Sequence, residues 1–384
     1  MEKLSQICDR FQKLFNEKPL LIRSPGRVNL IGEHTDYNEG FVLPTAIDKA
    51  IYFAISPRDD EQCTMYAYDL NDSHSFSMDS IIKSGKGWPN YLMGIVEQIR
   101  NMNYHISGFN CVFGGDVPIA AGLSSSAALE TGLAFALNEI FQLQLDKLTL
   151  VKLSQKAENE FVGVNCGIMD QLANIFSKEK HVFKLDCRSL ELEYFPFERE
   201  DIQIVLCDTQ VQRELASSEY NIRRSQCEEG VRVVQKSSPA VKSLRDVTRD
   251  VLQDHKNSFD PIVYRRCKYV IEENERVLSA CADLVKGNLE SFGQRMYQSH
   301  DGLKNEYEVS CSELDALVDG ASEIEGVLGS RMMGAGFGGC TINLVLRENL
   351  TDFKEKMNDV YQNRLKQRAK LYITRITEGT AILK

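Results

Sequence analysis

Strand-like and helix-like segments of this 384-residue chain come in groups instead of alternating. Short apolar runs typical of strands gather near the N-terminus, and the stretch from 264 to 307 has the apolar spacing of helices. A regular βαβ array requires strands and helices to alternate, so the grouping favours an α+β architecture. The length exceeds one average domain, which predicts two lobes. We expect them to cover residues 1–185 and 186–384, because chemistry-bearing motifs thin out after Leu185.

The charge and the cysteines limit the classes of partner and compartment. The formal net charge is -10 and no basic block offsets it, which argues against nucleic acid and anionic membrane as partners. The 11 cysteines are scattered, with neither zinc-ligand spacing nor a C-x-x-C pair, as in a cytoplasmic protein with reduced thiols. No apolar run is long enough to cross a bilayer, and the N-terminal segment has the pattern of an amphipathic helix, not of an export signal.

A cluster of polar residues follows the first expected strand. The run from Pro19 to Arg23 predicts a strand that enters a turn at residues 24–26, and the segment from Arg27 to Asn38 then places Arg, Glu, His, Asp and Asn around a glycine. Sugar hydroxyls donate and accept hydrogen bonds, so a sugar pocket needs carboxylates and mixed partners such as His and Asn. Such a pocket also rejects an epimer, because a misplaced hydroxyl leaves a buried carboxylate unpaired. A solvated surface turn has the same composition, so the segment alone fits both interpretations.

A loop of small residues, 115–126, lies between a strand expected at 109–113 and a helix expected at 124–141. Small residues let the backbone approach a phosphate, and the free N–H groups and dipole of a helix start favour an anion. Serine hydroxyls can add donors or reach a magnesium ion. The chain has no Gly-Lys-Ser/Thr sequence, which excludes a Walker A loop. A tightly packed helix start without a ligand is the alternative interpretation.

Two further motifs are ambiguous when taken singly. In the segment from Gly163 to Gln171, Asp170 fits either a base in phosphoryl transfer or a carboxylate at a helix start. Glu158, just upstream, fits either a metal ligand or an exposed helix glutamate. The glycine loop from Gly334 to Gly339 precedes a strand, whereas a dinucleotide-binding fingerprint follows a strand and begins a helix. The order of the elements therefore excludes a Rossmann site.

Together and in this order, the motifs resemble the GHMP kinase superfamily and, within it, the galactokinases. The resemblance runs from about Leu21 to about Val345. Beyond the polar cluster and the serine loop, it is carried by Gly40 to Pro44, Cys166 to Gln171, Leu185 to Leu190, Ser218 to Arg224 and Gly334 to Cys340.

The resemblance implies two α+β lobes with the active site between them. The implied enzyme phosphorylates D-galactose at its 1-hydroxyl with Mg-ATP, giving galactose 1-phosphate and ADP, the first committed step of galactose use, with no obligate protein partner. Asp170 would take the hydroxyl proton, and Arg27 would keep Asp170 ionised and stabilise the phosphoryl group in flight. The residues implied for the sugar are Glu33, His34, Thr35, Asp36, Gly167 and Tyr220. Those implied for the ATP phosphates are Ala120, Ala121, Gly122, Leu123, Ser124, Ser125 and Ser126, and those for Mg²⁺ are Ser126 and Glu158.

Two positions depart from the family pattern. Ala120 stands where the ATP loop usually has glycine, which would strain a backbone that only glycine favours, and Met333 stands where galactokinases often have Thr. A kinase for a related sugar, such as N-acetylgalactosamine, and a non-catalytic galactose and ATP sensor are the alternatives. Retention of Arg27, Asp170 and Ser126 favours the enzyme over the sensor. Mevalonate and homoserine kinases share the serine loop but lack the polar cluster.

Overall fold

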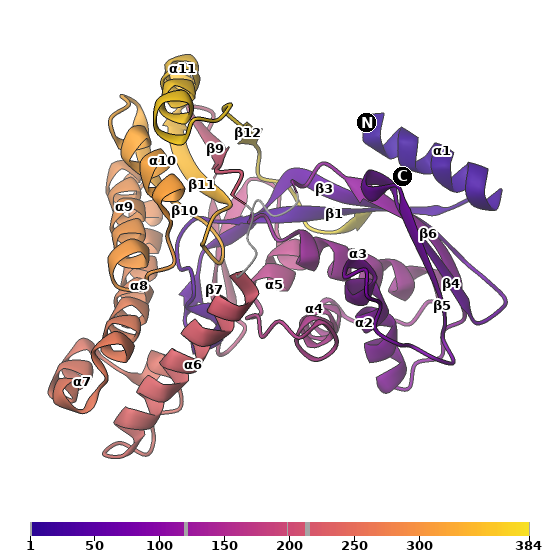
Figure 1. The fold of residues 1–384 in the computed structure, drawn as a ribbon, viewed down its shortest axis with the longest axis horizontal. Helices are drawn as coiled ribbons and strands as arrows, with labels where there is room; N and C mark the ends of the chain where they lie inside the picture. Colours follow the sequence, from indigo (N-terminus) through magenta and orange to yellow (C-terminus); the bar gives the residue numbers. More distant parts are fainter. Residues whose placement is uncertain (1, 119–121, 198, 212–215, 384) are drawn as a thin grey trace.

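The computed structural model of the protein describes residues 2–118, 122–197, 199–211 and 216–383. Its strands form three sheets, and helices cover the faces of the two larger sheets (Figure 1). The fold is α+β, as the grouping of elements predicts.

The first sheet has six strands in the order β13-β1-β3-β6-β4-β5. Their bounds are β1 (Leu20–Asn29), β3 (Pro44–Pro57), β4 (Gln62–Ala67), β5 (Asp72–Ser77), β6 (Phe109–Gly115) and β13 (Ala381–Ile382). The amphipathic helix expected at the N-terminus is α1 (Glu2–Phe15), which buries Ile7 and Phe11 against one face of the sheet. The other face is covered by α2 (Trp88–Asn101), α3 (Ser125–Ile140), α4 (Lys147–Lys156) and α5 (Met169–Phe176) (Figure 1).

Strand β1 pairs with β3 along its whole length, with one irregularity. The turn expected at residues 24–26 is therefore wrong, because the register shifts between Pro25 and Arg27 and the strand continues. Pro25 has no N–H for the ladder, and such positions in strands are found at edges or irregularities. Just beyond it the Arg27 N–H donates to the Leu123 carbonyl at 3.2 Å, which joins β1 to the serine loop.

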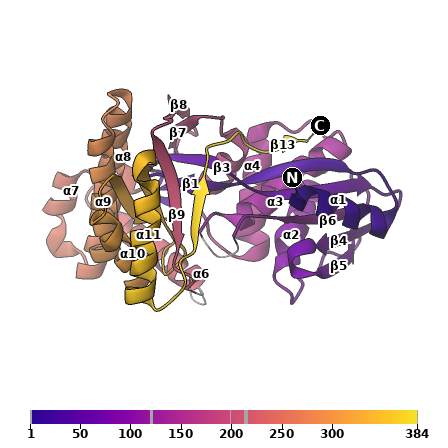
Figure 2. The same ribbon diagram turned by 90° about the horizontal axis from the view of Figure 1, so that it is seen from above.

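The second sheet has the order β10-β11-β9-β12 and is antiparallel throughout. Its strands are β9 (Ile202–Asp208), β10 (Val327–Met332), β11 (Cys340–Leu346) and β12 (Leu371–Thr374). Side chains of β9 alternate between the faces: Ile204 and Leu206 share an apolar core with α9, and Val205 and Cys207 share one with α10 and α11. The helices of this half are α6 (Ala216–Gln235), α7 (Arg249–Asp254), α8 (Pro261–Val285), α9 (Leu289–Asn305), α10 (Ser312–Ser322) and α11 (Leu350–Val360). Figure 2 shows α7 to α11 gathered at one end of the molecule and α1 to α4 at the other.

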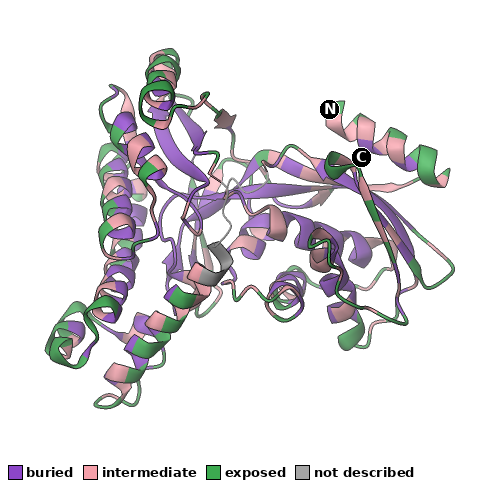
Figure 3. Ribbon diagram, in the orientation of Figure 1, coloured by how far each residue is buried: buried purple, intermediate pink, exposed green. Residues whose placement is uncertain are grey.

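The segment after β1 is packed between the two halves. A third sheet, in the order β2-β7-β8, lies there, with β2 (Phe41–Val42), β7 (His181–Asp186) and β8 (Leu192–Pro196). Val28 and Leu30 share an apolar core with Val277 of α8 and Phe292 of α9, so the polar cluster is anchored from both sides. Figure 3 shows buried residues concentrated in the strands where the halves meet. The last strand, β13, pairs with β1, and the division after residue 185 stays a prediction.

No helix in the described ranges is both long and apolar enough to span a membrane. The cysteines of the chain are all free thiols.

Candidate active site

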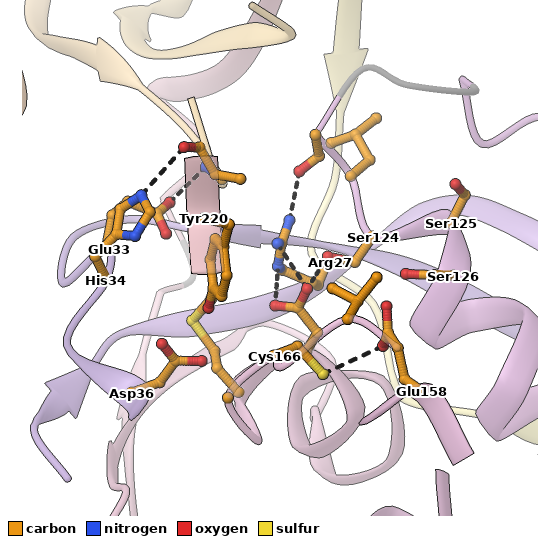
Figure 4. A pocket seen from close by; sticks show the side chains of 18 of the residues that line it. Arg27, Glu33, His34, Asp36, Ser124, Ser125, Ser126, Glu158, Cys166 and Tyr220 are labelled. Atoms are coloured by element: carbon orange, nitrogen blue, oxygen red, sulfur yellow. Dashed lines mark hydrogen bonds and ion pairs between the residues drawn. The ribbon is translucent and has the colours of Figure 1, made fainter. Parts of the chain in front are cut away.

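A cavity of about 250 Å³ lies where the end of β1, the serine loop, the start of α5 and the start of α6 meet (Figure 4). It brings together predicted residues that are far apart in the sequence. Those that line it are Arg27, Glu33, His34, Asp36, Gly122, Leu123, Ser124, Ser125, Ser126, Glu158, Gly167, Asp170 and Tyr220. Ala120 and Ala121 lie outside the described residues, so the structure does not address their predicted contact with phosphate.

Asp170, in the first turn of α5, is held by Arg27 of β1. The guanidinium Nε donates to Asp170 Oδ1 at 2.8 Å and Nη2 donates to Oδ2 at 2.9 Å, so the ion pair is bidentate. The remaining nitrogen, Nη1, donates to the Gly122 carbonyl at 2.5 Å, and the Ser124 hydroxyl donates to Asp170 Oδ2. The Arg27 side chain is 5% exposed and that of Asp170 is 27% exposed. The carboxylate therefore opens to the cavity while its cationic partner is enclosed.

The donors around Asp170 leave one acceptor position open. Oδ2 already accepts two hydrogen bonds, whereas Oδ1 accepts one from the described residues. A carboxylate oxygen has two lone pairs, so Oδ1 can accept a further hydroxyl. Burial alone would lower the pKa of the Arg27 guanidinium, but the charges of Asp170 and Glu33 outweigh it and raise the pKa. Arg27 thus stays a cation.

Glu33, in the turn after β1, is 2% exposed and is anchored by the other half of the molecule. Its Oε1 accepts from Arg331 Nη2 at 2.9 Å and from the Gly334 N–H at 2.8 Å. The fully buried Arg331 also donates to the carbonyls of Asn29 and Leu30, at 2.8 Å each. Glu33 Oε2 has no hydrogen-bond partner among the described residues, and it is available to a ligand in the cavity.

Asp36 begins a 3₁₀ turn (Asp36–Asn38) and its carboxylate points into the cavity (Figure 4). Burial, and after it the charge of Asp170, raises the pKa of Asp36 to about 7. Gly167, just before α5, makes room for this side chain, since a Cβ at Gly167 would lie 1.8 Å from Asp36 Oδ2. This glycine is required by close approach and not by backbone conformation.

His34 and Tyr220 form an aromatic wall of the cavity, with ring centroids 5.3 Å apart. Both ring nitrogens of His34 have protein partners: Nδ1 lies 2.7 Å from the Tyr37 hydroxyl and Nε2 lies 3.1 Å from the Ala335 carbonyl. The His34 ring borders the cavity without a nitrogen left for a ligand.

Thr35 is the described member of the predicted sugar set that does not line the cavity. It is fully buried, and its hydroxyl lies 2.9 Å from the Gly32 carbonyl and 2.6 Å from the Phe41 carbonyl. The side chain closes the turn from inside, so its contribution to the cavity is to the shape of the backbone.

The serine loop ends beside Asp170. Gly122 has a φ of 82° and Ser124 a φ of 52°, a left-handed turn that leads directly into α3. The first N–H groups of a helix have no intrahelical acceptor, and at the start of α3 Ser124, Ser125 and Ser126 line the cavity. This end of the cavity can hold an anion within reach of the carboxylate.

Glu158 is buried, at 6% exposure, which removes the interpretation as an exposed helix residue. It lies in a π-helical turn (Ala157–Val162) after α4, and its Oε2 accepts from Gln171 Nε2 at 2.9 Å. Glu130 of α3 lies beside it, fully buried, and neither Glu130 oxygen has a hydrogen-bond partner among the described residues. Burial raises the pKa of both carboxyls, and the charge of Glu158 adds to the rise at Glu130. This region therefore holds two neighbouring carboxyl groups, and the raised pKa of Glu130 favours its neutral form.

Six further residues line the cavity without a role predicted from the sequence, although all except Tyr91 lie within the motifs at 163–171 and 334–339. The cavity is completed by Tyr91, Val164, Cys166, Met169, Gly334 and Ala335. Gly334 and Ala335 belong to the late glycine loop, a motif that the sequence analysis found without assigning it a role. Burial raises the pKa of Tyr91 to about 12, and its helical position among apolar residues resembles a core tyrosine. Met333 is buried in the apolar core, where its N–H donates to the Cys340 carbonyl at 3.0 Å.

Three family signatures match the chain. A galactokinase galactose-binding signature matches residues 9–57, the N-terminal domain of GHMP kinases matches residues 90–178, and the C-terminal domain of GHMP kinases matches residues 280–363. The first covers the polar cluster, and the second covers the serine loop, Glu158 and Asp170.

Full-length relatives and solved structures agree with these signatures. Galactokinases of Roseiflexus sp. (strain RS-1) and Fusobacterium nucleatum are 41% and 39% identical, over 97% and 99% of this chain and 96% and 100% of theirs. The crystal structure of Lactococcus lactis galactokinase complexed with galactose has a TM-score of 0.96 at 36% identity, covering 99% of this chain and 100% of that one. A mevalonate kinase of Methanococcus jannaschii shares the fold alone, at a TM-score of 0.65 and 18% identity.

Proposed function

The chain belongs to the galactokinase family of GHMP kinases and is an ATP-dependent galactokinase, and from that premise we propose the role of each residue in the cavity. The two-lobed α+β fold and the reaction expected from the sequence are confirmed by these relatives. The observation that carries the assignment of roles is the bidentate pair of Arg27 and Asp170, placed between the polar cluster and the serine loop.

Asp170 is the base. As the galactose 1-hydroxyl oxygen bonds to the γ-phosphorus of ATP and the bond from that phosphorus to the ADP oxygen breaks, the hydroxyl proton passes to Asp170 Oδ1, which has the open acceptor position. In a loose phosphoryl-transfer transition state the nucleophile is little bonded, so alignment and charge neutralisation carry most of the catalysis. Arg27 holds the Asp170 carboxylate in place by their bidentate ion pair and lies close enough to the Gly122 end of the serine loop to stabilise the transferring group.

Galactose binds at the other end of the cavity. Glu33 Oε2 and the Asp36 carboxylate accept hydrogen bonds from sugar hydroxyls. Gly167 has no side chain and so leaves room for Asp36, and the Tyr220 ring covers the sugar. Thr35 contributes by holding the turn. The buried carboxylates support selectivity, because an epimer leaves one of them without a donor.

The ATP phosphates bind at the start of α3. The side chains of Ser124, Ser125 and Ser126 and the N–H groups of the first helical turn point to this end, next to Asp170. We extend the phosphate loop to Ala120 and Ala121 on the family pattern.

Magnesium fits the pocket beside these serines. Mg²⁺ prefers oxygen ligands and usually takes one or two from protein, with phosphates and water completing its shell. The Ser126 hydroxyl and the Glu158 carboxylate are such ligands, and both side chains line the cavity. When bound, Mg²⁺ would neutralise charge on the β- and γ-phosphates. In the described part of the chain no three His, Cys, Asp or Glu side chains form a complete metal cage, which agrees with a metal shared with phosphate.

We also propose the lobe division at residues 1–185 and 186–384, with β13 returning to the first sheet. The free thiols support the cytoplasm as the compartment of the enzyme.

The galactose affinity should depend on the protonation of Asp36. An ionised carboxylate accepts sugar hydroxyls more strongly than a protonated one. The pKa of Asp36 is about 7, so galactose binding should tighten about 3- to 10-fold as the pH rises from about 6 to about 8. Calorimetric titration with galactose and no ATP measures this. The sign for stability is opposite: the folded pKa is raised, so the stability that Asp36 contributes to the empty protein is lost as the pH rises through 7.

The Asp36→Asn variant is the control for this profile. It cannot ionise, so its galactose affinity should be weaker at high pH and nearly independent of pH over the same window. His34 does not titrate there, because burial lowers its pKa to about 3. A pH profile in Asp36→Asn that matches the native one would show that another group is responsible.

A further inference from the structure

An unbroken row of polar atoms runs from the cavity wall into the core of the second lobe. His34 Nδ1 lies 2.7 Å from the Tyr37 hydroxyl, which lies 2.7 Å from the Tyr307 hydroxyl, which lies 3.2 Å from Cys227 Sγ. Cys227 is on α6 and Tyr307 follows α9, and both are buried. We call these four side chains the hydroxyl chain.

The direction of every hydrogen bond in the hydroxyl chain is fixed by the contact between His34 and the Ala335 carbonyl. The Ala335 carbonyl can only accept, so His34 Nε2 carries the proton in the 3.1 Å contact between them. His34 is neutral, because burial and then the positive charges of Arg223 and Arg331 lower its pKa to about 3. Its Nδ1 is therefore an acceptor, and the Tyr37 hydroxyl donates to it.

The same reasoning continues into the core. Having donated to His34, the Tyr37 oxygen accepts from the Tyr307 hydroxyl, and the Tyr307 oxygen accepts from the thiol of Cys227. Burial raises the pKa of Cys227 to about 11, so the thiol keeps its proton at neutral pH. All members point the same way, and such aligned chains strengthen each bond.

The cavity end of the hydroxyl chain, His34, acts on Glu33 through the glycine loop. His34 fixes the Ala335 carbonyl, and the neighbouring Gly334 N–H donates to Glu33 Oε1 at 2.8 Å. This bond helps to aim Glu33 so that Oε2 remains for a sugar hydroxyl. His34 thus acts on the sugar site through the glycine loop, with both of its nitrogens engaged by protein.

We propose that Tyr307 and Tyr37 are positioning residues of the galactose site, which act through one fixed tautomer of His34 and the late glycine loop without touching the sugar. The inference rests on the proposed assignment of Glu33 to a galactose hydroxyl. It assigns His34 to the same positioning role, in place of the direct sugar contact expected from the sequence.

The kinetic test compares the galactose KM and kcat of two variants that each lose one tyrosine hydroxyl in the second lobe. Tyr307→Phe removes a member of the hydroxyl chain, and Tyr297→Phe removes a hydroxyl on α9 that is buried without a hydrogen-bond partner among the described residues. Tyr307→Phe should raise the galactose KM about 3- to 10-fold, the effect of one neutral hydrogen bond, with kcat and the ATP KM within about twofold of native. Tyr297→Phe should change none of them. An unchanged galactose KM in Tyr307→Phe, or an equal loss in all parameters, would overturn the proposal.

A spectroscopic test needs neither substrate nor turnover. In ¹⁵N-histidine NMR of the native enzyme, the His34 signal, assigned among the 6 histidines by its loss in His34→Gln, should show a protonated Nε2, a bare Nδ1 and no titration between about pH 5 and about pH 8. In Tyr37→Phe, which removes the donor to Nδ1, the Nδ1 resonance should move toward that of an unpartnered nitrogen. A protonated Nδ1, or titration near the usual value, would refute the proposal even if galactose binds as expected. A native enzyme with this spectrum and no saturable response to galactose would instead refute the assignment of the sugar site.

Discussion

Replacing Asp170 by Asn should lower kcat for galactose phosphorylation by about 10²- to 10⁴-fold, the usual contribution of a positioned base. The variant keeps the size of the side chain but cannot take the hydroxyl proton, and its amide N–H group faces the Arg27 donors in place of an acceptor. The sugar carboxylates Glu33 and Asp36 are unchanged, so the galactose Kd should stay within a few-fold. Coupled ADP release measures the first quantity and calorimetry the second.

A surface aspartate gives the matched control. Asp352 pairs with Lys356 at 2.8 Å on α11, which lies apart from α3 and α5 (Figure 1), and it does not line the cavity, so Asp352→Asn should behave as the native enzyme. Turnover of Asp170→Asn within about tenfold of native would remove Asp170 from the role of base. If Asp170→Asn weakens galactose binding as much as it lowers turnover, Asp170 binds the sugar and does not act as the base.

Chelating magnesium should reduce turnover to background, and added Mg²⁺ should restore it. The phosphates of ATP would otherwise meet the carboxylates of Asp170 and Glu158, which line the cavity, with no counter-ion, a repulsion that is costly where water is excluded. Arg27 is the one cationic side chain among the described residues that line the cavity, and three of its N–H groups already donate to Asp170 and the Gly122 carbonyl. The protein alone therefore has little charge to offer the phosphates.

The variant Glu158→Gln locates the metal. It should raise the Mg²⁺ concentration for half-maximal activity by about 10- to 100-fold, while the galactose KM stays near native. Glu160→Gln, two positions along the same π-helical turn but outside the lining of the cavity, is the control. Full activity in excess chelator would contradict the metal assignment, and an unchanged Mg²⁺ requirement in Glu158→Gln would move the metal to other ligands.

Short motifs, taken together in their order and with their resemblance to one family, predicted most of the site. Arg27, Glu33, Asp36, Asp170 and the serine loop stand in short motifs whose residue types suit a sugar or a phosphate, and the structure brings them to one cavity. The strand at Phe109–Gly115 and the helix at Ser125–Ile140 follow from apolar patterning on either side of the loop. These features depend on neighbours in sequence.

What the sequence could not give depends on partners far along the chain. Glu33 is held by Arg331, 298 residues away, and His34 by Ala335, 301 residues away. The hydroxyl of Thr35 points inward to two backbone carbonyls. The neighbouring residues in the sequence do not distinguish this orientation from one that faces a ligand. The sequence around Glu158 also fits an exposed helix glutamate. In the structure the residue is buried, in the π-helical turn that follows α4.

The pairing of strands also could not be predicted from neighbouring residues alone. Residues 24–26 have the composition of a turn, and the irregular pairing of β1 with β3 keeps them extended. The polar strand β5 (Asp72–Ser77) alternates weakly and was not among the expected elements; it is fixed by pairing with β4. Both outcomes are decided by a neighbouring strand and not by the residues themselves.

The most direct measurement of the central claim is coupled ADP release with a panel of sugars: galactose, glucose, N-acetylgalactosamine and arabinose. If Glu33 and Asp36 accept sugar hydroxyls as proposed, an epimer leaves one of these enclosed carboxylates without a donor, so kcat/KM for galactose should exceed that for glucose by at least about 100-fold. Strong turnover on galactose alone would support the reaction and the sugar site together. Preference for another sugar would contradict the assignment of the pocket, and absence of turnover on every sugar, with binding retained, would contradict catalysis itself.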